Sequence, residues 1–363
     1  MVATAPFRFE LPDALLAREP PEKRGLERDQ VRLLAVDRQA GALKHTRFDG
    51  IGDLLRPGDC LVFNASRTLP ASLQAFIANG PYAGRTLQLR LARGNEDGTW
   101  SALPLTLEDE PWLGELGGAR LQFRSAGVMP QGNPGARLSA EVVGRDPLVE
   151  RLWRLRFSLH GAAWMECLSR LGNPVRYWYS SAPWDLDFYQ TVYAREPGSM
   201  EMPSAGRAFS WKLLLELRRR GIDTAFLVLH AGLSSYLDEK FDAGHPASVE
   251  PYRLEAEAAA RINAAKARGG RIVAVGTTVV RALETAGADG RVSAGKGRTC
   301  LRITPSHRLN AVDGLLTGFH EPQASHLDLL SAFLPPESLK SVYDAALEAG
   351  YLWHEFGDAN LIL

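Results

Sequence analysis

The chain has 363 residues, and its 42 lysines and arginines balance its 42 aspartates and glutamates, so its formal net charge is zero. This balance excludes the globally basic surface of a histone-like nucleic-acid binder, although it permits a local basic face. At roughly 150 residues per domain the length predicts two or three domains. Hydrophobic residues make up 45% and charged residues 23%, as is typical of folded globular proteins.

The cysteines and the apolar runs indicate the cellular compartment of the protein. Cys60, Cys167 and Cys300 are far apart and form no CxxC pair, so we expect neither a disulfide framework nor a zinc ribbon. No run approaches the roughly 18 apolar residues of a membrane helix. The N-terminus also lacks the basic start and apolar stretch of a signal peptide. The sequence therefore predicts a cytoplasmic protein without a membrane partner.

Short strands are predicted in the first part of the chain. Val31–Asp37 and Leu43–Phe48 flank a polar turn, and Asp59–Asn64 is an apolar run typical of a buried strand. No helical period follows between Ser66 and residue 158. The short runs there are separated by glycine, proline, asparagine and aspartate; they are Thr86–Leu91, Thr99–Leu103, Arg120–Arg124, Arg137–Val143 and Trp153–Ser158. This pattern predicts a small β-barrel or β-sandwich.

Helical periods alternate with strands after residue 161. The predicted helices are Ser210–Arg220, Leu254–Arg268, Val280–Ala286, Ser325–Phe333 and Glu337–Ala349, and the predicted strands are Ile222–Leu229 and Arg271–Val275. Ser210 is the expected N-cap of its helix, because a serine oxygen accepts from free N–H groups there. This alternation predicts an α/β fold. We expect an α/β main domain of residues 1–66 and 159–363, with an antiparallel β-barrel domain of residues 67–158 inserted into it.

Two strand ends carry candidate chemistry. One predicted strand leads through Gly276 into Thr277 and Thr278 at a helix N-terminus, where free N–H groups bind anions or carboxylates. The alternative is that Thr278 only caps the helix. Another strand ends at His230, and ligands of α/β proteins bind at strand ends. The alternative for His230 is a hydrogen-bonded core histidine.

Two further segments contain polar candidates. His320, Glu321 and His326 suggest a metal site, but their spacing is not HExxH and Pro322 breaks the helix that such a site needs, so a polar loop is favoured. Arg67 follows a predicted buried strand, and its guanidinium suits either a phosphate or carboxylate ligand or a surface ion pair. The chain has neither GxGxxG nor a P-loop at its glycine turn, which disfavours dinucleotide and NTP binding.

Six segments, in this order along the chain, resemble the S-adenosylmethionine:tRNA ribosyltransferase-isomerase family of queuosine biosynthesis. They are the N-terminal FRFELP with the following PPEKR, RPGDCLVFNASRTLPASL at Arg56–Leu73, YQTVYAREPGS at Tyr189–Ser199, VGTTVVRALE at Val275–Glu284, AVDGLLTGFHEP at Ala311–Pro322 and FGDANLIL at Phe356–Leu363. The resemblance covers most of the chain and is weakest in the β-rich insertion.

The resemblance implies a fold, a reaction and partners. The main domain would be a loosely barrel-like α/β domain that carries an inserted β-barrel. S-adenosylmethionine would be a co-substrate that donates its ribosyl group, with no metal. The acceptor would be the aminomethyl group of a 7-deazaguanine base in the tRNA anticodon loop. The products would be epoxyqueuosine in the tRNA, adenine and methionine. We expect the protein to be a monomer.

The resemblance also implies a set of site residues. His320 or His230 would transfer protons, with Glu250 and Asp313 as the other catalytic candidates. Thr277, Thr278 and Arg281 would hold the polar end of the donor. The substrate-binding candidates are Asn64, Arg67, Gly206, Phe209, Gly232, Tyr252, Thr277, Thr278, Arg281, Gly314, Thr317, Phe319 and Asp358.

The chain departs from the family pattern within these segments. Ala208 and Ser248 stand where the family has histidines, Gly318 where it has asparagine, and Gln323 where it has a basic residue. Removing cations and donors weakens phosphate contacts, which dominate RNA affinity. Two alternatives therefore stay open. One is a paralogue that uses the same donor with a different amine acceptor, and the other is a non-catalytic nucleoside- or RNA-binding relative.

Overall fold

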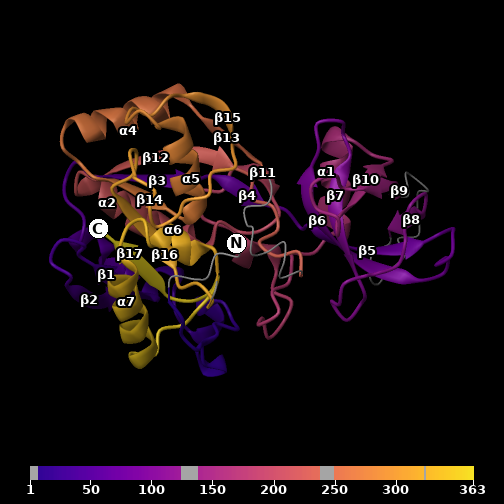
Figure 1. Cartoon of the computed structure of the whole chain (residues 1–363), viewed down its shortest axis with the longest axis horizontal. Coiled ribbons are helices and arrows are strands. Elements are labelled where there is room, and N and C mark those ends of the chain that lie inside the picture. Colours follow the sequence, from indigo (N-terminus) through magenta and orange to yellow (C-terminus); the bar gives the residue numbers. More distant parts are fainter. Residues whose placement is uncertain (1–6, 124–137, 238–248, 323) are drawn as a thin grey trace.

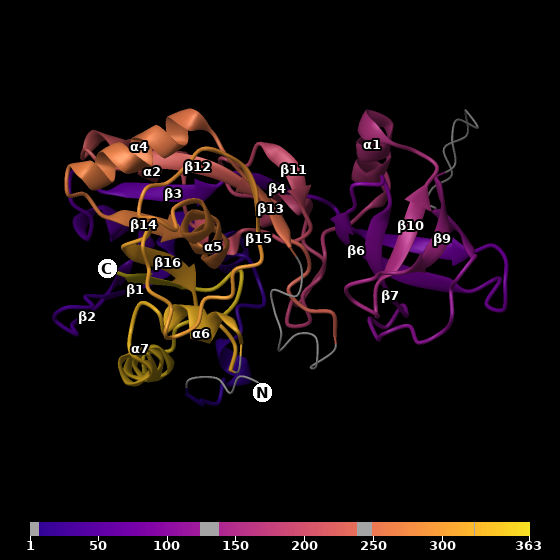
Figure 2. The same cartoon turned by 45° about the horizontal axis from the view of Figure 1, so that its top comes forward.

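An α/β part and a β-barrel lie side by side in this protein (Figure 1). The computed structural model describes residues 7–123, 138–237, 249–322 and 324–363. A two-stranded sheet of β4 (Ser66–Thr68) and β11 (Glu196–Ser199) lies between the two parts in both views (Figures 1 and 2). Within the described residues, no helix is both long and apolar enough to cross a membrane.

The α/β part is built on a nine-stranded mixed sheet. In spatial order its strands are β15 (Gly295–Thr299), β13 (Glu250–Leu254), β12 (Asp223–Leu229), β3 (Cys60–Asn64), β14 (Ile272–Val275), β16 (Gly314–Gly318), β17 (Ala359–Ile362), β1 (Arg32–Val36) and β2 (Leu43–Arg47). The strands β12, β3, β14 and β16 run parallel to one another, and β17 is antiparallel to β16. The carboxyl ends of the four parallel strands therefore share one edge of the sheet.

Helices cover both faces of this sheet. They are α2 (Trp211–Arg219), α4 (Ala256–Ala267), α5 (Thr277–Ala286), α6 (His326–Leu330) and α7 (Pro336–Glu348). On β3, Cys60 and Val62 belong to one hydrophobic cluster with residues of α4, α5, α6 and α7. Leu61 and Phe63 belong to a second cluster with α2. Burial on both faces is typical of parallel strands, and it explains why the predicted strand Asp59–Asn64 is continuously apolar.

Short 3-10 turns connect several of these elements. They are η1 (Asp13–Leu15), η2 (Pro21–Arg24), η3 (Arg28–Gln30), η4 (Phe48–Asp53), η5 (Leu186–Tyr189) and η6 (Ser204–Gly206). Ser210 caps α2 as predicted, because its Oγ accepts from the backbone N–H of Leu213 at 3.1 Å.

The barrel closes through six antiparallel strands in the order β10-β7-β6-β5-β8-β9. They are β5 (Ser72–Ile77), β6 (Thr86–Gly94), β7 (Trp100–Leu105), β8 (Arg120–Phe123), β9 (Ser139–Arg145) and β10 (Trp153–Phe157), and the helix α1 (Gly161–Leu171) follows. Trp164 of α1 packs on Phe157 with ring centroids 4.0 Å apart. Closure leaves the six strands without an exposed edge, which protects them from pairing with other chains.

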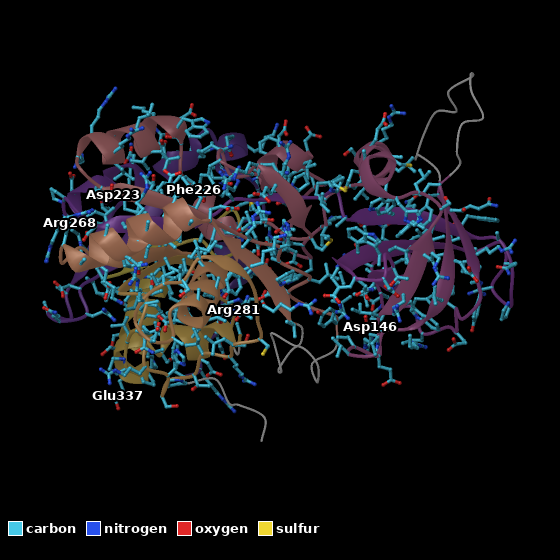
Figure 3. All side chains as sticks on the ribbon, turned by 90° about the horizontal axis from the view of Figure 1, so that it is seen from above. Asp146, Asp223, Phe226, Arg268, Arg281 and Glu337 are labelled. Carbon is cyan, nitrogen blue, oxygen red and sulfur yellow. The ribbon has the colours of Figure 1, made fainter. Side chains whose placement is uncertain are left out.

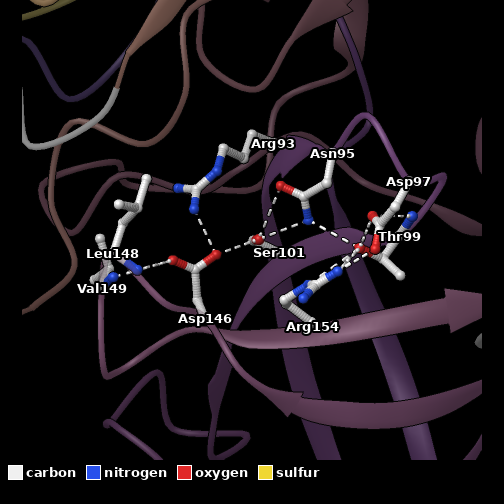
Figure 4. Close-up of polar contacts among 9 residues, drawn as sticks. All are labelled: Arg93, Asn95, Asp97, Thr99, Ser101, Asp146, Leu148, Val149 and Arg154. Atoms are coloured by element: carbon white, nitrogen blue, oxygen red, sulfur yellow. Dashed lines mark hydrogen bonds and ion pairs between the residues drawn. The ribbon is translucent and has the colours of Figure 1, made fainter.

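A polar network joins the strand ends of the barrel (Figure 4). Asp146 accepts from Ser101 Oγ at 2.6 Å and from Arg93 at 2.5 Å. Its other carboxylate oxygen accepts from the backbone N–H groups of Leu148 and Val149 at 2.9 and 3.0 Å. Burial opposes ionisation, but these hydrogen bonds hold the pKa of Asp146 below its usual range. A buried carboxylate with this many donors supports the barrel's structure rather than chemistry.

The structure confirms an α/β fold with an inserted antiparallel β-barrel. The barrel-like form implied for the main domain corresponds to the nine-stranded sheet, whose edge strands among the described residues are β15 and β2. The limits of the two domains, residues 67 and 158, stay a prediction. Two details differ from expectation. Helix α5 begins at Thr277 with Gly276 as N-cap at φ +98°, so the alternative that Thr278 only caps the helix is wrong. Leu254 ends strand β13, where it pairs with Leu227 of β12, and it does not begin a helix.

Candidate active site

Most of the predicted site residues lie along one edge of the large sheet. The strand β12 ends before His230, β14 ends before Thr277, and β16 ends before His320. Ala359 at the start of β17 pairs with Gly318 at the end of β16, which brings Asp358 to the same edge. Ligands of α/β proteins bind at the carboxyl ends of parallel strands. This edge is therefore the candidate active site.

Two stacked histidines occupy the middle of the edge. The rings of His320 and His326 have centroids 4.5 Å apart and planes inclined by 3°. Nε2 of His320 lies 2.9 Å from Oγ1 of Thr317. Burial lowers the pKa of His320 well below its usual range and lowers that of His326 to about 4. Both rings are therefore neutral at pH 7, and a neutral imidazole has one nitrogen that accepts a proton.

A buried ion pair lies beside the second histidine. Arg281 of α5 pairs directly with Glu250 at the start of β13, and the two residues are only 5% and 6% exposed. Figure 3 shows Arg281 in the α/β part, apart from Asp146 in the barrel. Burial raises the pKa of Glu250, although Arg281 opposes this change. Arg281 and His326 line a shared hollow, so the guanidinium is placed to meet an anionic group there.

A small surface cavity adjoins Thr317, the hydrogen-bond partner of His320. Thr317, Asp358 and residues of η3 and η6 line it. Gly206 lies in η6, and a methyl group at this position would come within 1.8 Å of the Tyr193 hydroxyl. Only glycine therefore fits there. His320 is hydrogen-bonded to Thr317, which lines the cavity, and stacks on His326, which lines the hollow. It therefore connects the two.

His230 lies farther along the same edge, beside the small sheet. Its Nδ1 is 2.8 Å from Ser66 Oγ, and a methyl group at Gly198 would come within 2.4 Å of the same nitrogen. Burial lowers the pKa of His230. Asn64 holds the strand end, because its side chain donates to the carbonyl of Leu229 at 2.8 Å and accepts from its N–H at 3.0 Å. Asn64 thus positions His230, whose own bonding matches the core-histidine alternative.

Two predicted substrate-binding aromatics lie inside the hydrophobic core. Phe209 is fully buried, with its ring centroid 4.9 Å from those of Phe48 and Phe63. Phe319 packs on Trp353 at 4.9 Å. These rings support the loops that carry His320 and Gly206, but the described contacts give them no free face for a purine.

The remaining candidates are scattered. Asp358 lines the cavity, although its carboxylate also accepts from the N–H groups of Arg32 and Leu352 at 2.7 and 2.8 Å. Arg67 is exposed on β4. Gly232 faces the barrel, where a methyl group would meet the carbonyl of Ala92 at 3.1 Å. Thr278 on α5 is partly buried, and Tyr252 on β13 lies over Gly297.

Asp313 and Gly314 do not lie at this edge, and their role as site residues stays a prediction. They lie at the start of β16, where Gly314 pairs with Val273 near the start of the parallel strand β14. Asp313 accepts from the N–H of Ile272 at 2.8 Å and donates its own N–H to the carbonyl of the same residue at 2.8 Å. The length of β16 separates them from His320. Asp313 therefore joins two strand ends.

The Asp313→Ala protein is expected to lose stability without losing chemistry. Removing an acceptor from a buried backbone N–H costs about 1–3 kcal/mol, whereas the site edge keeps its contacts. Chemical denaturation should show the loss, and the rate constant of the folded protein should stay within about threefold of the wild-type value. A loss of turnover of a hundredfold or more, with unchanged stability, would support the prediction that Asp313 is catalytic.

The departures from the family pattern fall partly on the cavity. Ala208 and Gly318 both line it, so the missing family side chains leave space there. Arg207, beside Ala208, is 2% exposed and donates to Glu22 at 2.7 Å. Ser248 and Gln323 lie outside the described residues.

Sequence reasoning missed two residues of the cavity, His354 and Glu355, which precede the FGDA segment. His354 has φ +74° and stacks on Tyr179 with ring centroids 4.1 Å apart. A titratable pair beside a family motif was the available signal. In the described part of the chain, no group of three or more histidine, cysteine, aspartate or glutamate side chains is arranged to hold a metal ion.

The sheet, the inserted barrel and the motif-lined edge agree with what comparison shows. The chain belongs to the queuosine biosynthesis protein family, whose model matches residues 4–362. It is 40% identical to the S-adenosylmethionine:tRNA ribosyltransferase-isomerase of Moorella thermoacetica, with 98% of each chain covered. Identity to the enzyme of the same name from Thermus thermophilus is 39%, again with 98% of each chain covered. The crystal structure of S-adenosylmethionine tRNA ribosyltransferase from Thermotoga maritima aligns with 99% of this chain and all of that one, at a TM-score of 0.54 and 28% identity.

Proposed function

We propose that this chain is an S-adenosylmethionine:tRNA ribosyltransferase-isomerase of queuosine biosynthesis. It transfers the ribosyl group of S-adenosylmethionine to the 7-aminomethyl-7-deazaguanine base of tRNA and isomerises it, which forms epoxyqueuosine and releases adenine and methionine. The observation that carries the proposal is the convergence of family segments on one edge of the sheet, around the stacked pair of His320 and His326.

The chemistry needs groups that this edge can supply. A sulfonium makes the adjacent 5′ carbon acidic, so a neutral imidazole can remove its proton and allow the ribose to open with loss of adenine. The acceptor amine then attacks the sugar, and an alkoxide displaces methionine to close the epoxide. We assign the proton transfers to His320, with Thr317 positioning its ring at 2.9 Å. A positioned acid or base contributes roughly 10²–10⁴-fold.

Arg281, Thr277 and Thr278 would hold the polar end of the donor. Arg281 and Thr277 are buried at the first turns of α5, where the helix N-terminus also attracts a carboxylate. Asp358 would shape the cavity next to Thr317, and Gly206 would support its wall through the 3-10 turn η6.

The acceptor would be an unstacked base of the tRNA anticodon loop. Trp178 is 71% exposed, and its ring centroid lies 6.2 Å from that of His354, which lines the cavity. Proteins commonly bind unstacked RNA bases on aromatic rings beside basic side chains, and Arg176 is also exposed in this segment. We place this reaction in the cytoplasm, with the protein acting as a monomer.

Coupled release of two products tests the proposal. The protein is incubated with S-adenosylmethionine and tRNA that carries 7-aminomethyl-7-deazaguanine, and adenine and methionine are quantified together. We expect equal release that requires this tRNA, while the same tRNA with guanine gives none. Donor binding without release would indicate a different amine acceptor. If the donor did not bind at all, the function would be refuted in favour of a non-catalytic relative.

A further inference from the structure

Glu355 places a carboxyl group in the wall of the cavity beside Asp358 and Thr317. Its Oε2 atom is buried and has no hydrogen-bond partner among the described residues. No lysine or arginine in the described part of the chain forms an ion pair with it. A buried carboxyl group without such compensation is unfavourable in its ionised form. Its position in a cavity wall suggests that a ligand supplies the missing charge.

The nearby cations are already engaged by other groups. Arg207 donates to Glu22 at 2.7 Å and to the carbonyl of Phe188 at 2.8 Å. Arg28 donates to the carbonyl of Gln190 at 3.3 Å and lies 3.7 Å from Glu22. The other titratable groups around the cavity or near the Glu355 carboxyl are Arg24, Tyr177, Glu201, His354 and Asp358. Burial lowers the pKa of His354 to about 4, so its ring is neutral at pH 7.

No cation therefore opposes the effect of burial on the pKa of Glu355. Burial raises the pKa of this carboxyl to about 7. At pH 8 the Glu355 carboxyl is mostly ionised, and at pH 6 it is mostly protonated. A permanent cation bound in the cavity would stabilise the ionised form and be stabilised by it.

We propose that Glu355 is the counter-ion of the donor's sulfonium and selects S-adenosylmethionine over neutral thioethers of the same shape. The proposal rests on the proposed function, which makes S-adenosylmethionine the donor. A sulfonium has no N–H or O–H to donate, so a carboxylate recognises it by charge alone. The reaction turns this sulfur into the neutral thioether of methionine. The attraction is then lost, which favours release of the product.

Direct binding in the absence of tRNA tests this inference. Dissociation constants for S-adenosylmethionine and for the neutral S-adenosylhomocysteine are measured by calorimetry at pH 6 and pH 8. The proteins are the wild type, Glu355→Gln, and Glu257→Gln as a matched control. Glu257 is exposed on α4 and pairs with Arg261, far from the cavity in sequence and outside its lining. The thioether reports whether each variant keeps a folded site.

We expect Glu355→Gln to raise the dissociation constant for S-adenosylmethionine at pH 8 by about 30-fold or more. Removing one partner of a buried charge pair has an effect of this size. Binding of the thioether should change less than threefold. In the wild type, the preference for the sulfonium should rise between pH 6 and pH 8 as the carboxyl ionises, and this rise should be absent in Glu355→Gln. The control should behave as the wild type.

Equal weakening of both ligands, or a preference for the sulfonium that survives in Glu355→Gln, would overturn the counter-ion role while leaving the proposed function intact. A wild-type protein that binds neither ligand would overturn both proposals. A wild type that binds S-adenosylmethionine and the thioether equally at pH 8 would overturn the counter-ion role alone.

Discussion

The His320→Gln protein is expected to bind S-adenosylmethionine and to lose turnover by about 10²–10⁴-fold. Glutamine keeps a polar side chain near Thr317, but it cannot exchange a proton near neutral pH. The backbone of the loop is held independently, because His320 N–H donates to the Tyr343 hydroxyl at 3.3 Å and its carbonyl accepts from the Trp353 indole at 3.0 Å. The rate of adenine release at saturating donor and tRNA measures the loss.

The pH profile gives a second readout of the same role. Burial lowers the pKa of His320 well below its usual range, so the folded protein keeps the neutral ring at pH values where a free histidine is protonated. The wild-type rate should therefore fall only in acid, below the usual histidine range. Any residual rate of His320→Gln should lack this fall.

A matched control separates chemistry from stability. His160 precedes α1 and makes no capping hydrogen bond with its side chain, so His160→Gln should keep both the unfolding temperature and the rate. If His320→Gln lowered the unfolding temperature as strongly as the rate, its ring would be structural. If it kept its rate within threefold, the proton transfers would belong to another residue, and His230 would be tested next.

The fold could be predicted where local sequence and tertiary environment agree. The apolar strand β3 and the capped helix α2 are such elements. β13 and β15 could not be predicted, because Pro251 and the glycines of Gly295–Thr299 are unfavourable in strands. These strands form because they pair with each other and with β12. No local pattern contains that information.

The site residues that lie within the sequence motifs could be predicted. The parallel pairing of β14 and β16 explains why Thr277 and His320 lie at the same edge of the sheet, and why Asp313 lies at the opposite edge. The stacking of His326 on His320 depends on the path between β16 and α6. Glu355 becomes notable only through its burial and its missing partner, which no sequence shows.

Breaking the Glu250–Arg281 pair from one side is expected to destabilise the protein by about 3–5 kcal/mol, because one buried charge is left without compensation. In Arg281→Met the remaining charge is the Glu250 carboxylate. Burial already raises the pKa of this group, and removing the cation raises it further. The folded state then binds the proton more tightly than the unfolded state, so stability decreases as pH rises through this window. The deficit of Arg281→Met, measured by urea denaturation, should shrink from pH 8 to pH 5.

The double variant Glu250→Gln/Arg281→Met removes both charges and should recover most of the lost stability, since neither group remains buried and ionised. It should not recover donor affinity if Arg281 holds the polar end of S-adenosylmethionine. As a control, Arg261→Met breaks an exposed pair with Glu257 on α4 and should cost less than about 1 kcal/mol. A double variant that is stable and binds the donor as the wild type does would show that Arg281 serves the fold alone. A stable double variant that has lost binding would place the guanidinium on the donor, because restored folding removes the structural explanation for the loss.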